Sequence, residues 1–186
     1  MLGMTEVRWK DQGDININSG DYRMIYLGGH ETQCGVTLLL DKQTSQAKVE
    51  VDCCSGRLMV VRWCRTPVDL LVVVVYMPTS DHLDEEVEEL YERIEEKLAT
   101  CKGKHYLLVL GDINATVEEE KILNVVGNYG LGKRNTRGEM LVDFCMRNNL
   151  MITNLLLKKG TLGKYQETKG DCSWTISSSG RGIRQV

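Results

Sequence analysis

The sequence predicts a single α/β domain in which helices cover sheets that are antiparallel or mixed. The chain has 186 residues, enough for one domain with its own core and too few for two ordinary ones. Short β-type runs fill its first part, and helical stripes alternate with apolar runs in its second part. This order of elements is typical of layered α/β domains.

Five runs rich in Val, Ile, Leu and Tyr, separated by turn residues, predict the first strands. They are Tyr22 to Leu27, Gly35 to Leu40, Ala47 to Asp52, Arg57 to Cys64 and Val68 to Tyr76. Their close spacing predicts antiparallel neighbours. Leu70 to Val75 is apolar at every position, which indicates a strand in the middle of a sheet, covered on both faces.

After Pro78 the apolar period becomes helical. The apolar stripe consists of Val87, Leu90, Tyr91, Ile94 and Leu98. Acidic residues occupy the opposite face, so we expect a helix with one buried and one solvated side. Ser80 or Asp81 is expected to cap its first turn.

A second helix and three further strands complete the predicted domain. Tyr106 to Leu110 is another buried-strand pattern, and Leu150 to Ile152 and Ser173 to Thr175 are shorter runs. The start of the second helix is signalled by Thr136 to Glu139, which has capping-box spacing, and the helix is expected to end near Asn148-Asn149.

Charge is segregated along the chain, although the formal net charge is only −3 at pH 7. Residues 84–97 hold eight acidic and two basic side chains, which is typical of a solvated helix face. From Gly127 onward ten basic residues stand against four acidic ones. That excess fits an ordinary surface or one that faces phosphates. The composition, 42% hydrophobic and 26% charged, excludes disordered, collagen-like and coiled-coil chains.

The sequence also bears on the compartment. No apolar run approaches the roughly 20 residues of a spanning helix, and the N-terminus has no signal-peptide pattern. Seven cysteines without C-x-x-C spacing favour a reducing compartment. We therefore expect an intracellular protein, nuclear or cytoplasmic, with no membrane partner. The sequence leaves the oligomeric state open.

Three strand ends carry residues suited to phosphate chemistry. Asp112 and Asn114 follow a buried strand and project to the same side of an extended chain, where they could handle one phosphate or one water. They are equally common as turn residues. Tyr76 ends the longest apolar run and offers a phenolic O–H, unless it is simply an aromatic at a sheet rim. Glu6 could hold Mg²⁺, although most such glutamates are merely exposed.

The order of these residues resembles the endonuclease/exonuclease/phosphatase superfamily. It is most similar to the apurinic-type endonuclease domain of non-LTR retrotransposons and to craniofacial development protein 2-like proteins. The segments that carry the resemblance are Met1 to Lys10, Ser19 to Tyr22, Val75 to Ser80, Leu108 to Ala115, Gly130 to Gly138 and Leu141 to Cys145. It extends over residues 1–186.

This resemblance implies a four-layer α/β sandwich of two mixed sheets face to face, with helices outside. It also implies DNA as the partner and Mg²⁺-dependent phosphodiester hydrolysis, with Mn²⁺ as a second candidate metal. By resemblance, Glu6 binds the metal and Tyr76 contacts the scissile phosphate. Asp112 activates the attacking water, and Asn114 binds the phosphate.

Two arginines extend this expected site. Arg134 and Arg137 bracket Asn135-Thr136 at a helix N-terminus, where backbone N–H groups favour anions. We expect both guanidinium groups to line the approach and to contact substrate phosphates.

Relative to the superfamily, the sequence begins after a strand that carries a metal-site asparagine. It ends before a catalytic aspartate and an Asp-His pair. We therefore expect an incomplete domain, truncated at both ends. We also expect little or no turnover, because the rate of a reaction catalysed by several residues together falls steeply when one of them is missing. The alternative is an inactive pseudo-nuclease that binds nucleic acid or protein, and a phosphatase of inositol lipids or nucleotides is a weaker possibility.

Overall fold

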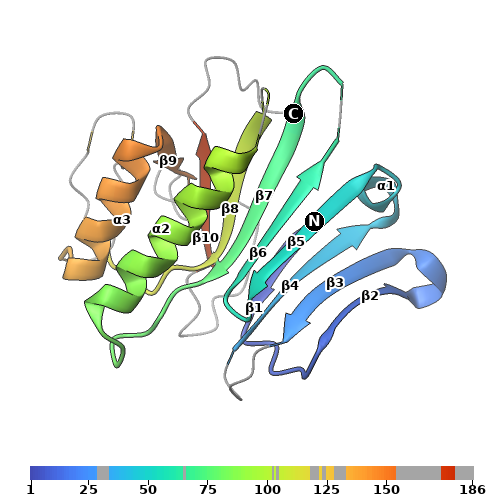
Figure 1. The fold of residues 1–186 in the computed structure, drawn as a ribbon, viewed down its shortest axis with the longest axis horizontal. Coiled ribbons are helices and arrows are strands. Elements are labelled where there is room, and N and C mark those ends of the chain that lie inside the picture. The colour runs from blue at the N-terminus through green and yellow to red at the C-terminus, as the bar shows by residue number, and fades with distance from the viewer. Residues whose placement is uncertain are drawn as a thin grey trace.

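Two β-sheets pack face to face, and two long helices cover the outer face of one of them (Figure 1). The computed structural model describes residues 1–28, 34–64, 66–101, 103, 105–117, 122, 125–127, 133–153 and 173–178, the last segment by its backbone alone. None of the helices in these ranges has the length and apolar character needed to cross a membrane.

The smaller sheet has four antiparallel strands in the order β1-β4-β3-β2. Their bounds are β1 Leu2–Thr5, β2 Gln12–Ile17, β3 Tyr22–Gly28 and β4 Gly35–Asp41. Two short helical turns accompany this sheet, η1 at Asn18–Gly20 and α1 at Lys42–Ser45. The predicted antiparallel pairing of Tyr22 to Leu27 with Gly35 to Leu40 is confirmed as the pairing of β3 with β4.

The larger sheet has six strands in the order β5-β6-β7-β8-β10-β9. Their bounds are β5 Val49–Ser55, β6 Leu58–Trp63, β7 Asp69–Tyr76, β8 His105–Asp112, β9 Leu150–Ile152 and β10 Ser173–Ser178. β7 and β8 are parallel, so this sheet is mixed. The chain between these two strands forms helix α2, Asp84–Thr100, as parallel neighbours require a crossover. Helix α3 spans Thr136–Arg147.

β7 contributes to two hydrophobic cores, one on each of its faces. Val72 and Val74 lie in the core between the sheets. Val73 and Val75 lie in the core between the larger sheet and the helices. Both faces of β7 are therefore covered, as its unbroken apolar sequence predicts.

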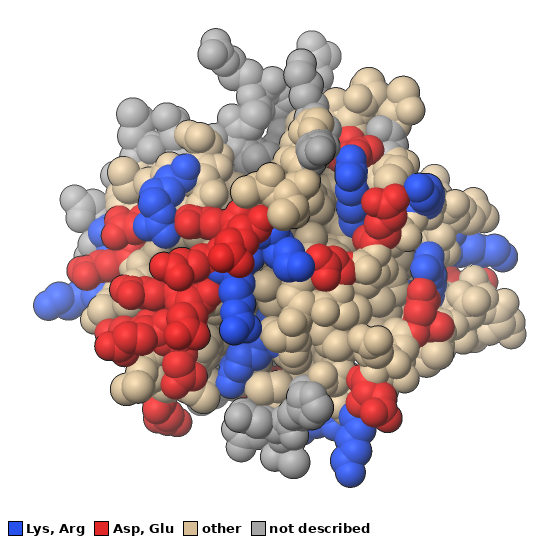
Figure 2. Space-filling view, viewed as in Figure 1, with Lys and Arg blue, Asp and Glu red and all other residues tan. Residues whose placement is uncertain are grey.

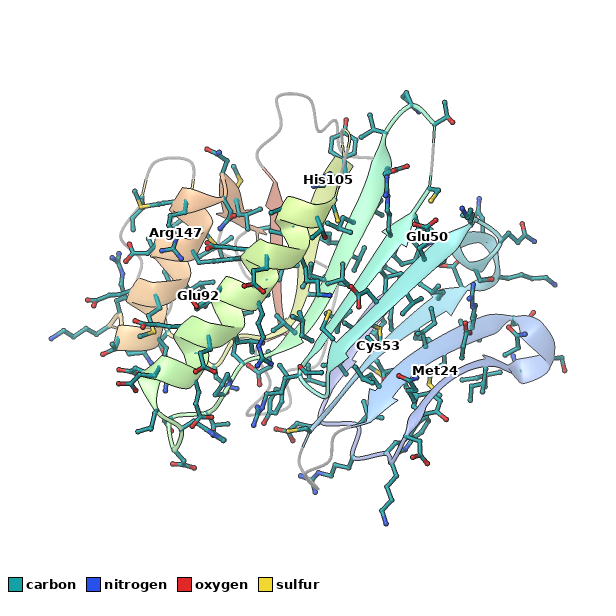
Figure 3. All side chains as sticks on the ribbon, in the orientation of Figure 1. Met24, Glu50, Cys53, Glu92, His105 and Arg147 are labelled. Atoms are coloured by element: carbon teal, nitrogen blue, oxygen red, sulfur yellow. The ribbon has the colours of Figure 1, made fainter. Side chains whose placement is uncertain are left out.

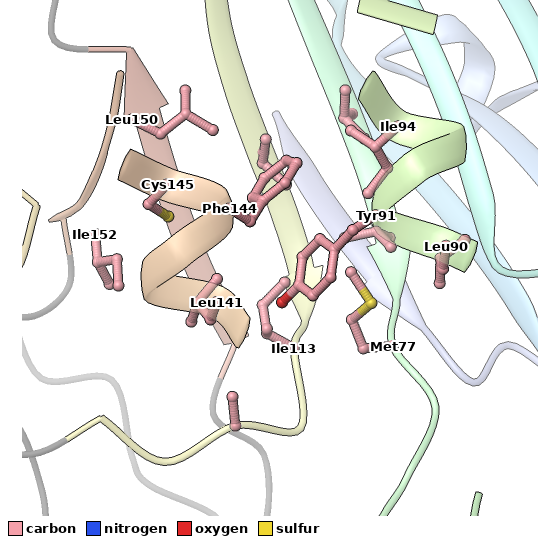
Figure 4. Packing of buried hydrophobic residues seen from close by; sticks show 14 of the residues in the cluster. Met77, Leu90, Tyr91, Ile94, Ile113, Leu141, Phe144, Cys145, Leu150 and Ile152 are labelled. Atoms are coloured by element: carbon pink, nitrogen blue, oxygen red, sulfur yellow. The ribbon is translucent and has the colours of Figure 1, made fainter. Parts of the chain in front are cut away.

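The helices pack on the larger sheet through their apolar stripes. Tyr91 of α2 and Phe144 of α3 stack with ring centroids 4.6 Å apart (Figure 4). Met77 and Ile113, which follow β7 and β8, belong to the same core. The predicted stripe of the first helix is confirmed, because Val87, Leu90, Tyr91 and Ile94 are buried and Leu98 packs against them.

Both predicted helix caps differ from the structure. Helix α2 begins at Asp84 after Leu83, which makes no side-chain cap, so neither Ser80 nor Asp81 caps it. Acidic residues in its first turn stabilise that end through the helix dipole. Helix α3 begins at Thr136 as predicted, but its cap is Asn135, whose Oδ1 accepts from Gly138 N at 2.8 Å.

Neither β1 nor β2 is among the runs predicted as strands, although the sequence places Glu6 at a strand end, and the layers differ in one respect. β2 is an exposed edge strand of mixed polarity, so it has no buried pattern to detect. β1 is only four residues long. The α/β sandwich is confirmed. Within the described residues, however, the two long helices lie on the larger sheet alone, and the smaller sheet is accompanied only by single turns.

Candidate functional site

The site predicted from the sequence lies where β7 and β8 end. Parallel strands end at the same edge of a sheet, and the register pairs Tyr76 at the end of β7 with Asp112 at the end of β8. Beyond this pair, Met77 N donates to Asp112 O at 2.8 Å. The two chain segments therefore leave the sheet side by side.

Glu6 reaches the same edge from the other sheet. It directly follows β1, and its carboxylate Oε1 accepts a hydrogen bond from Tyr76 Oη at 2.7 Å. β1 can come close to β8 because Gly3 has no side chain: a Cβ there would lie 3.1 Å from Leu110 Cβ. This close approach brings together two residues that are 70 positions apart in the sequence.

The turn after β8 holds Asp112 and Asn114 in fixed positions. Asn114 N donates to Asp112 Oδ1 at 3.0 Å, and Asn114 Nδ2 donates to Met77 O at 2.8 Å. Asn114 has a φ of 50°, a left-handed conformation that asparagine tolerates better than most residues. The amide of Asn114 thereby ties the segment after β8 to the segment after β7.

Gly111 is required for this arrangement. Its φ is +138°, and a Cβ at this position would lie 1.8 Å from Val75 O. Only glycine allows β8 to pass β7 at this distance immediately before Asp112. The Gly-Asp-Ile-Asn sequence is therefore a backbone requirement as well as a source of polar side chains.

The phenol of Tyr76 is the electrostatic centre of the site. Burial and the hydrogen bond to Glu6 raise the pKa of Tyr76 to about 12. The carboxylates of Glu6 and Asp112 also act on this phenol, and the nearby guanidinium of Arg57 opposes them. Both candidate acids therefore lie within electrostatic reach of Tyr76, which is a protonated donor at neutral pH.

Arg57 is a member of this cluster that the sequence analysis missed. Its guanidinium carbon lies 5.0 Å from the centroid of the Tyr76 ring, and its Nη2 lies 3.4 Å from His82 Nε2. Tyr76 N donates to Arg57 O at 2.9 Å. Since β6 runs antiparallel to β7, the turn residue directly before β6 must lie near the end of β7. That pairing is the signal that could have identified Arg57.

The two arginines predicted to contact phosphates occupy different surroundings. Arg137 is 8% exposed, and its Nη2 donates to His82 O at 2.7 Å and lies 3.2 Å from Asp84 Oδ1. These contacts join the start of α3 to the start of α2. Arg134 is half-buried over the first turn of α3, beside Gly138. A phosphate contact for either residue stays a prediction.

The donor set is compatible with Mg²⁺. Within the described ranges, no three His, Cys, Asp or Glu side chains cluster closely enough to enclose a metal ion. Mg²⁺ does not require such a cage, because it keeps several waters and is held by one or two carboxylates together with substrate phosphates. Glu6, which accepts the hydrogen bond of Tyr76, and Asp112, whose charge acts on the same phenol, are carboxylates of that kind.

Solved structures identify the class of fold. The endonuclease domain of TRAS1, a telomere-specific non-LTR retrotransposon, superposes with a TM-score of 0.56 at 16% identity, over 84% of this chain and 64% of that domain. The AP endonuclease LMAP from Leishmania major also gives a TM-score of 0.56, at 12% identity, over 86% of this chain and 62% of that one. The fold is that of the endonuclease/exonuclease/phosphatase domains.

The sequence comparison points to a particular relative. The chain is 32% identical to craniofacial development protein 2 of Bos taurus over 172 residues, which is 92% of this chain and 29% of that protein. The chain therefore spans less than a third of the length of that protein. No family model matches the chain. The resemblance stated from the motifs is confirmed for the fold and for this relative.

Proposed function

We propose that this domain hydrolyses phosphodiester bonds in DNA, with Mg²⁺ as the cofactor. The observation that carries the proposal is the 2.7 Å hydrogen bond from Tyr76 Oη to Glu6 Oε1 at the edge where Asp112 leaves β8. The nuclease-like fold supports the reaction class, and the retrotransposon and AP endonucleases that share it support nucleic acid as the substrate.

In this proposal, Asp112 is the general base. A carboxylate activates water when it accepts the proton at hydrogen-bond distance. The Asn114 N–H bonded to Asp112 Oδ1 fixes the orientation of the carboxylate. Asn114 carries two amide N–H donors, so it can keep its bond to Met77 O and still donate to a phosphate oxygen.

Tyr76 supplies a second donor to the phosphate. A phosphate oxygen that arrives beside the phenol can accept the hydrogen bond that Glu6 accepts in its absence. This exchange leaves the Glu6 carboxylate available to hold a metal ion. Mg²⁺, when bound, supplies positive charge that stabilises the developing negative charge on the phosphate.

The test is nicking of supercoiled plasmid DNA in Mg²⁺, repeated in Mn²⁺ and in excess EDTA. In line with the low turnover expected from the sequence, we expect weak metal-dependent nicking that Asp112→Ala abolishes. Glu89→Gln on the exposed face of α2 is the matched control, since it also neutralises one carboxylate and should nick as the unaltered chain does. Equal nicking by Asp112→Ala and the unaltered chain would disprove the assignment.

A second candidate function is binding without turnover. It is favoured by the fact that Glu6 already contacts both Tyr76 and Arg8, whose Nη2 is 3.7 Å from Glu6 Oε2. Asn114 is likewise bonded to backbone. Glu6, Tyr76 and Asn114 thus already have hydrogen-bond or ion-pair partners within the protein when no substrate is bound. DNA binding in Mg²⁺ with no nicking, and with affinity unchanged in Asp112→Ala, would favour this function over hydrolysis.

A further inference from the structure

A groove between α2 and α3 lies on the helical side of the molecule, away from the sheet edge that carries Tyr76. We call it the α2–α3 groove, and it encloses a cavity of about 360 Å³. Its lining residues are Glu88, Tyr91, Glu92 and Glu95 of α2 and Met140, Asp143 and Arg147 of α3. Four carboxylates thus face one guanidinium. Figure 2 shows the acidic side chains gathered over this side, and Figure 3 shows Glu92 and Arg147 on the two helices.

The charges of this groove are only partly paired. Glu95 Oε1 accepts from Arg147 Nε at 3.2 Å and from Asn148 Nδ2 at 2.8 Å, which joins the helices at one end of the groove. Within the described residues, Glu88, Glu92 and Asp143 form no ion pair. The rest of the groove therefore holds three carboxylates whose charges are not compensated by the fold.

A buried hydroxyl distinguishes this groove from an ordinary solvated helix face. Tyr91 lines the groove although it is 4% exposed, because its ring stacks on Phe144 across the two helices (Figure 4). Its hydroxyl has no hydrogen-bond partner among the described residues. The hydroxyl oxygen is not fully buried, and Tyr91 is one of the residues that line the groove. Burial raises the pKa of Tyr91 well above its ordinary value, which keeps the hydroxyl protonated.

We propose that the α2–α3 groove binds a Lys- or Arg-containing segment of another protein, with one basic side chain inserted between the helices. Long basic side chains have an apolar stem and a charged end. Met140 and the edge of the Tyr91 ring offer an apolar floor for the stem. Glu88, Glu92 and Asp143 offer acceptors for the charged end, and the Tyr91 hydroxyl is a further acceptor.

The charge of the groove determines the class of partner. Uncompensated carboxylates repel phosphates, so this side of the molecule does not suit a nucleic acid. The proposed DNA site lies on the segments that follow β7 and β8, whereas the groove is lined by residues of α2 and α3. This inference therefore does not rest on the proposed function, and the two can fail separately.

The experiment measures the affinity of a fluorescein-labelled peptide of alternating arginine and glycine by fluorescence anisotropy. Glu88→Gln, Glu92→Gln and Asp143→Asn together should weaken binding by about tenfold, because three ion pairs are lost. The matched control is Glu85→Gln, Glu89→Gln and Glu96→Gln, which removes the same number of negative charges from the chain at exposed positions outside the groove. The control should change affinity by less than about twofold.

Removing the Tyr91 hydroxyl distinguishes insertion of a basic side chain into the groove from general electrostatic attraction between the peptide and the acidic helices. Tyr91→Phe keeps the stacked ring and removes only an oxygen that bonds to nothing in the described structure, so the fold should be unaffected. It should weaken peptide binding by about threefold, the loss of one hydrogen bond. Equal effects of the groove and control triples, or no effect of Tyr91→Phe, would overturn the proposal. So would self-association of the chain that the groove triple abolishes, since the occupant would then be a second copy.

Discussion

Tyr76 shows how one side chain can serve both the fold and the candidate site. Its ring is buried in the core between the sheets, and its hydroxyl reaches Glu6 at the edge of that core. The same phenol lies opposite Asp112 in the register and beneath the guanidinium of Arg57. A change at this position therefore affects stability and site chemistry together, and pH is the variable that separates them.

The raised pKa of Tyr76 predicts a loss of stability at alkaline pH. The folded state holds the phenolic proton until about pH 12, whereas an unfolded tyrosine releases it near pH 10. The stabilising contribution is therefore complete below pH 10 and is lost as the pH rises towards 12. Urea unfolding at pH 9 and at pH 11 should show a smaller decrease in the free energy of unfolding for Tyr76→Phe than for the unaltered chain. An equal decrease would contradict the pKa of this residue.

Substitution of Arg137 should mainly lower the stability of the fold, whereas substitution of Arg134 should mainly affect DNA binding. Arg137 Nη2 bonds to His82 O within a buried contact, so Arg137→Ala should lower the free energy of unfolding by about 1.5–3 kcal/mol, the contribution of hydrogen bonds to charged groups. Arg134→Ala should leave stability closer to that of the unaltered chain and should reduce the salt dependence of DNA binding by about one unit of slope. Urea unfolding and DNA titrations at several salt concentrations measure the two effects. A stable Arg137→Ala would show that the contact has no structural importance.

At the scale of elements, helix α3 depends on a cap that also positions the preceding segment. Asn135 Oδ1 accepts from Gly138 N at 2.8 Å and from Thr116 N at 3.0 Å. One oxygen thus satisfies the start of the helix and the chain that follows the candidate site. Gly138 is needed for the same contact, because a Cβ there would lie 2.0 Å from Thr116 O.

Removing this cap should cost more than removing the neighbouring hydroxyl. Asn135→Ala should lower the free energy of unfolding by about 1–2 kcal/mol, the usual effect of deleting an N-cap. Thr136→Ala is the matched control, since the capping oxygen belongs to Asn135, and it should have the smaller effect. Thermal or urea unfolding of both variants makes the comparison. The reverse order would restore Thr136 as the cap.

The sequence predicts those helices and strands in which buried positions recur as apolar residues at a regular spacing. β7 and β8 and the stripe of α2 are predicted because apolar residues recur at the right period. β2 is not predicted, because it is an exposed edge strand without a recurring set of buried apolar residues. The caps are mistaken because several polar residues before each helix are equally good candidates, and tertiary contacts such as the one from Thr116 N to Asn135 Oδ1 decide among them.

The candidate site is predictable in part for the same reason. Asp112 and Asn114 are conspicuous because they follow a buried strand directly. The contact of Glu6 with Tyr76 depends on how β1 lies against the larger sheet, which no local pattern encodes. The sequence therefore singles out Glu6 only as a carboxylate at a strand end that could hold Mg²⁺, and it does not predict its contact with Tyr76. Arg57 belongs to a turn, and its proximity to Tyr76 follows from strand pairing rather than from spacing.

At the scale of the whole molecule, the two cores are joined through a single strand. β7 is paired on both edges, with β6 and with β8, and it supplies side chains to the cores on both of its faces. The layers of the sandwich therefore cannot separate without exposing one face of β7. The helical layer and the smaller sheet should consequently unfold as one cooperative unit rather than independently.

Hydrogen exchange should reveal this dependence. Backbone amides of β7 can exchange only when both cores open, which approaches global unfolding, so they should be the slowest in the chain. Those of β2, paired on one side and mostly exposed, should exchange through local opening and be the fastest among the strands.

Val72→Ala removes packing from the core between the sheets, and Val73→Ala removes packing from the helical core. If β7 joins the layers, mass spectrometry of either variant should show faster exchange in both β4 and α2. Faster exchange confined to the layer beside the substituted residue would show that the two cores unfold separately.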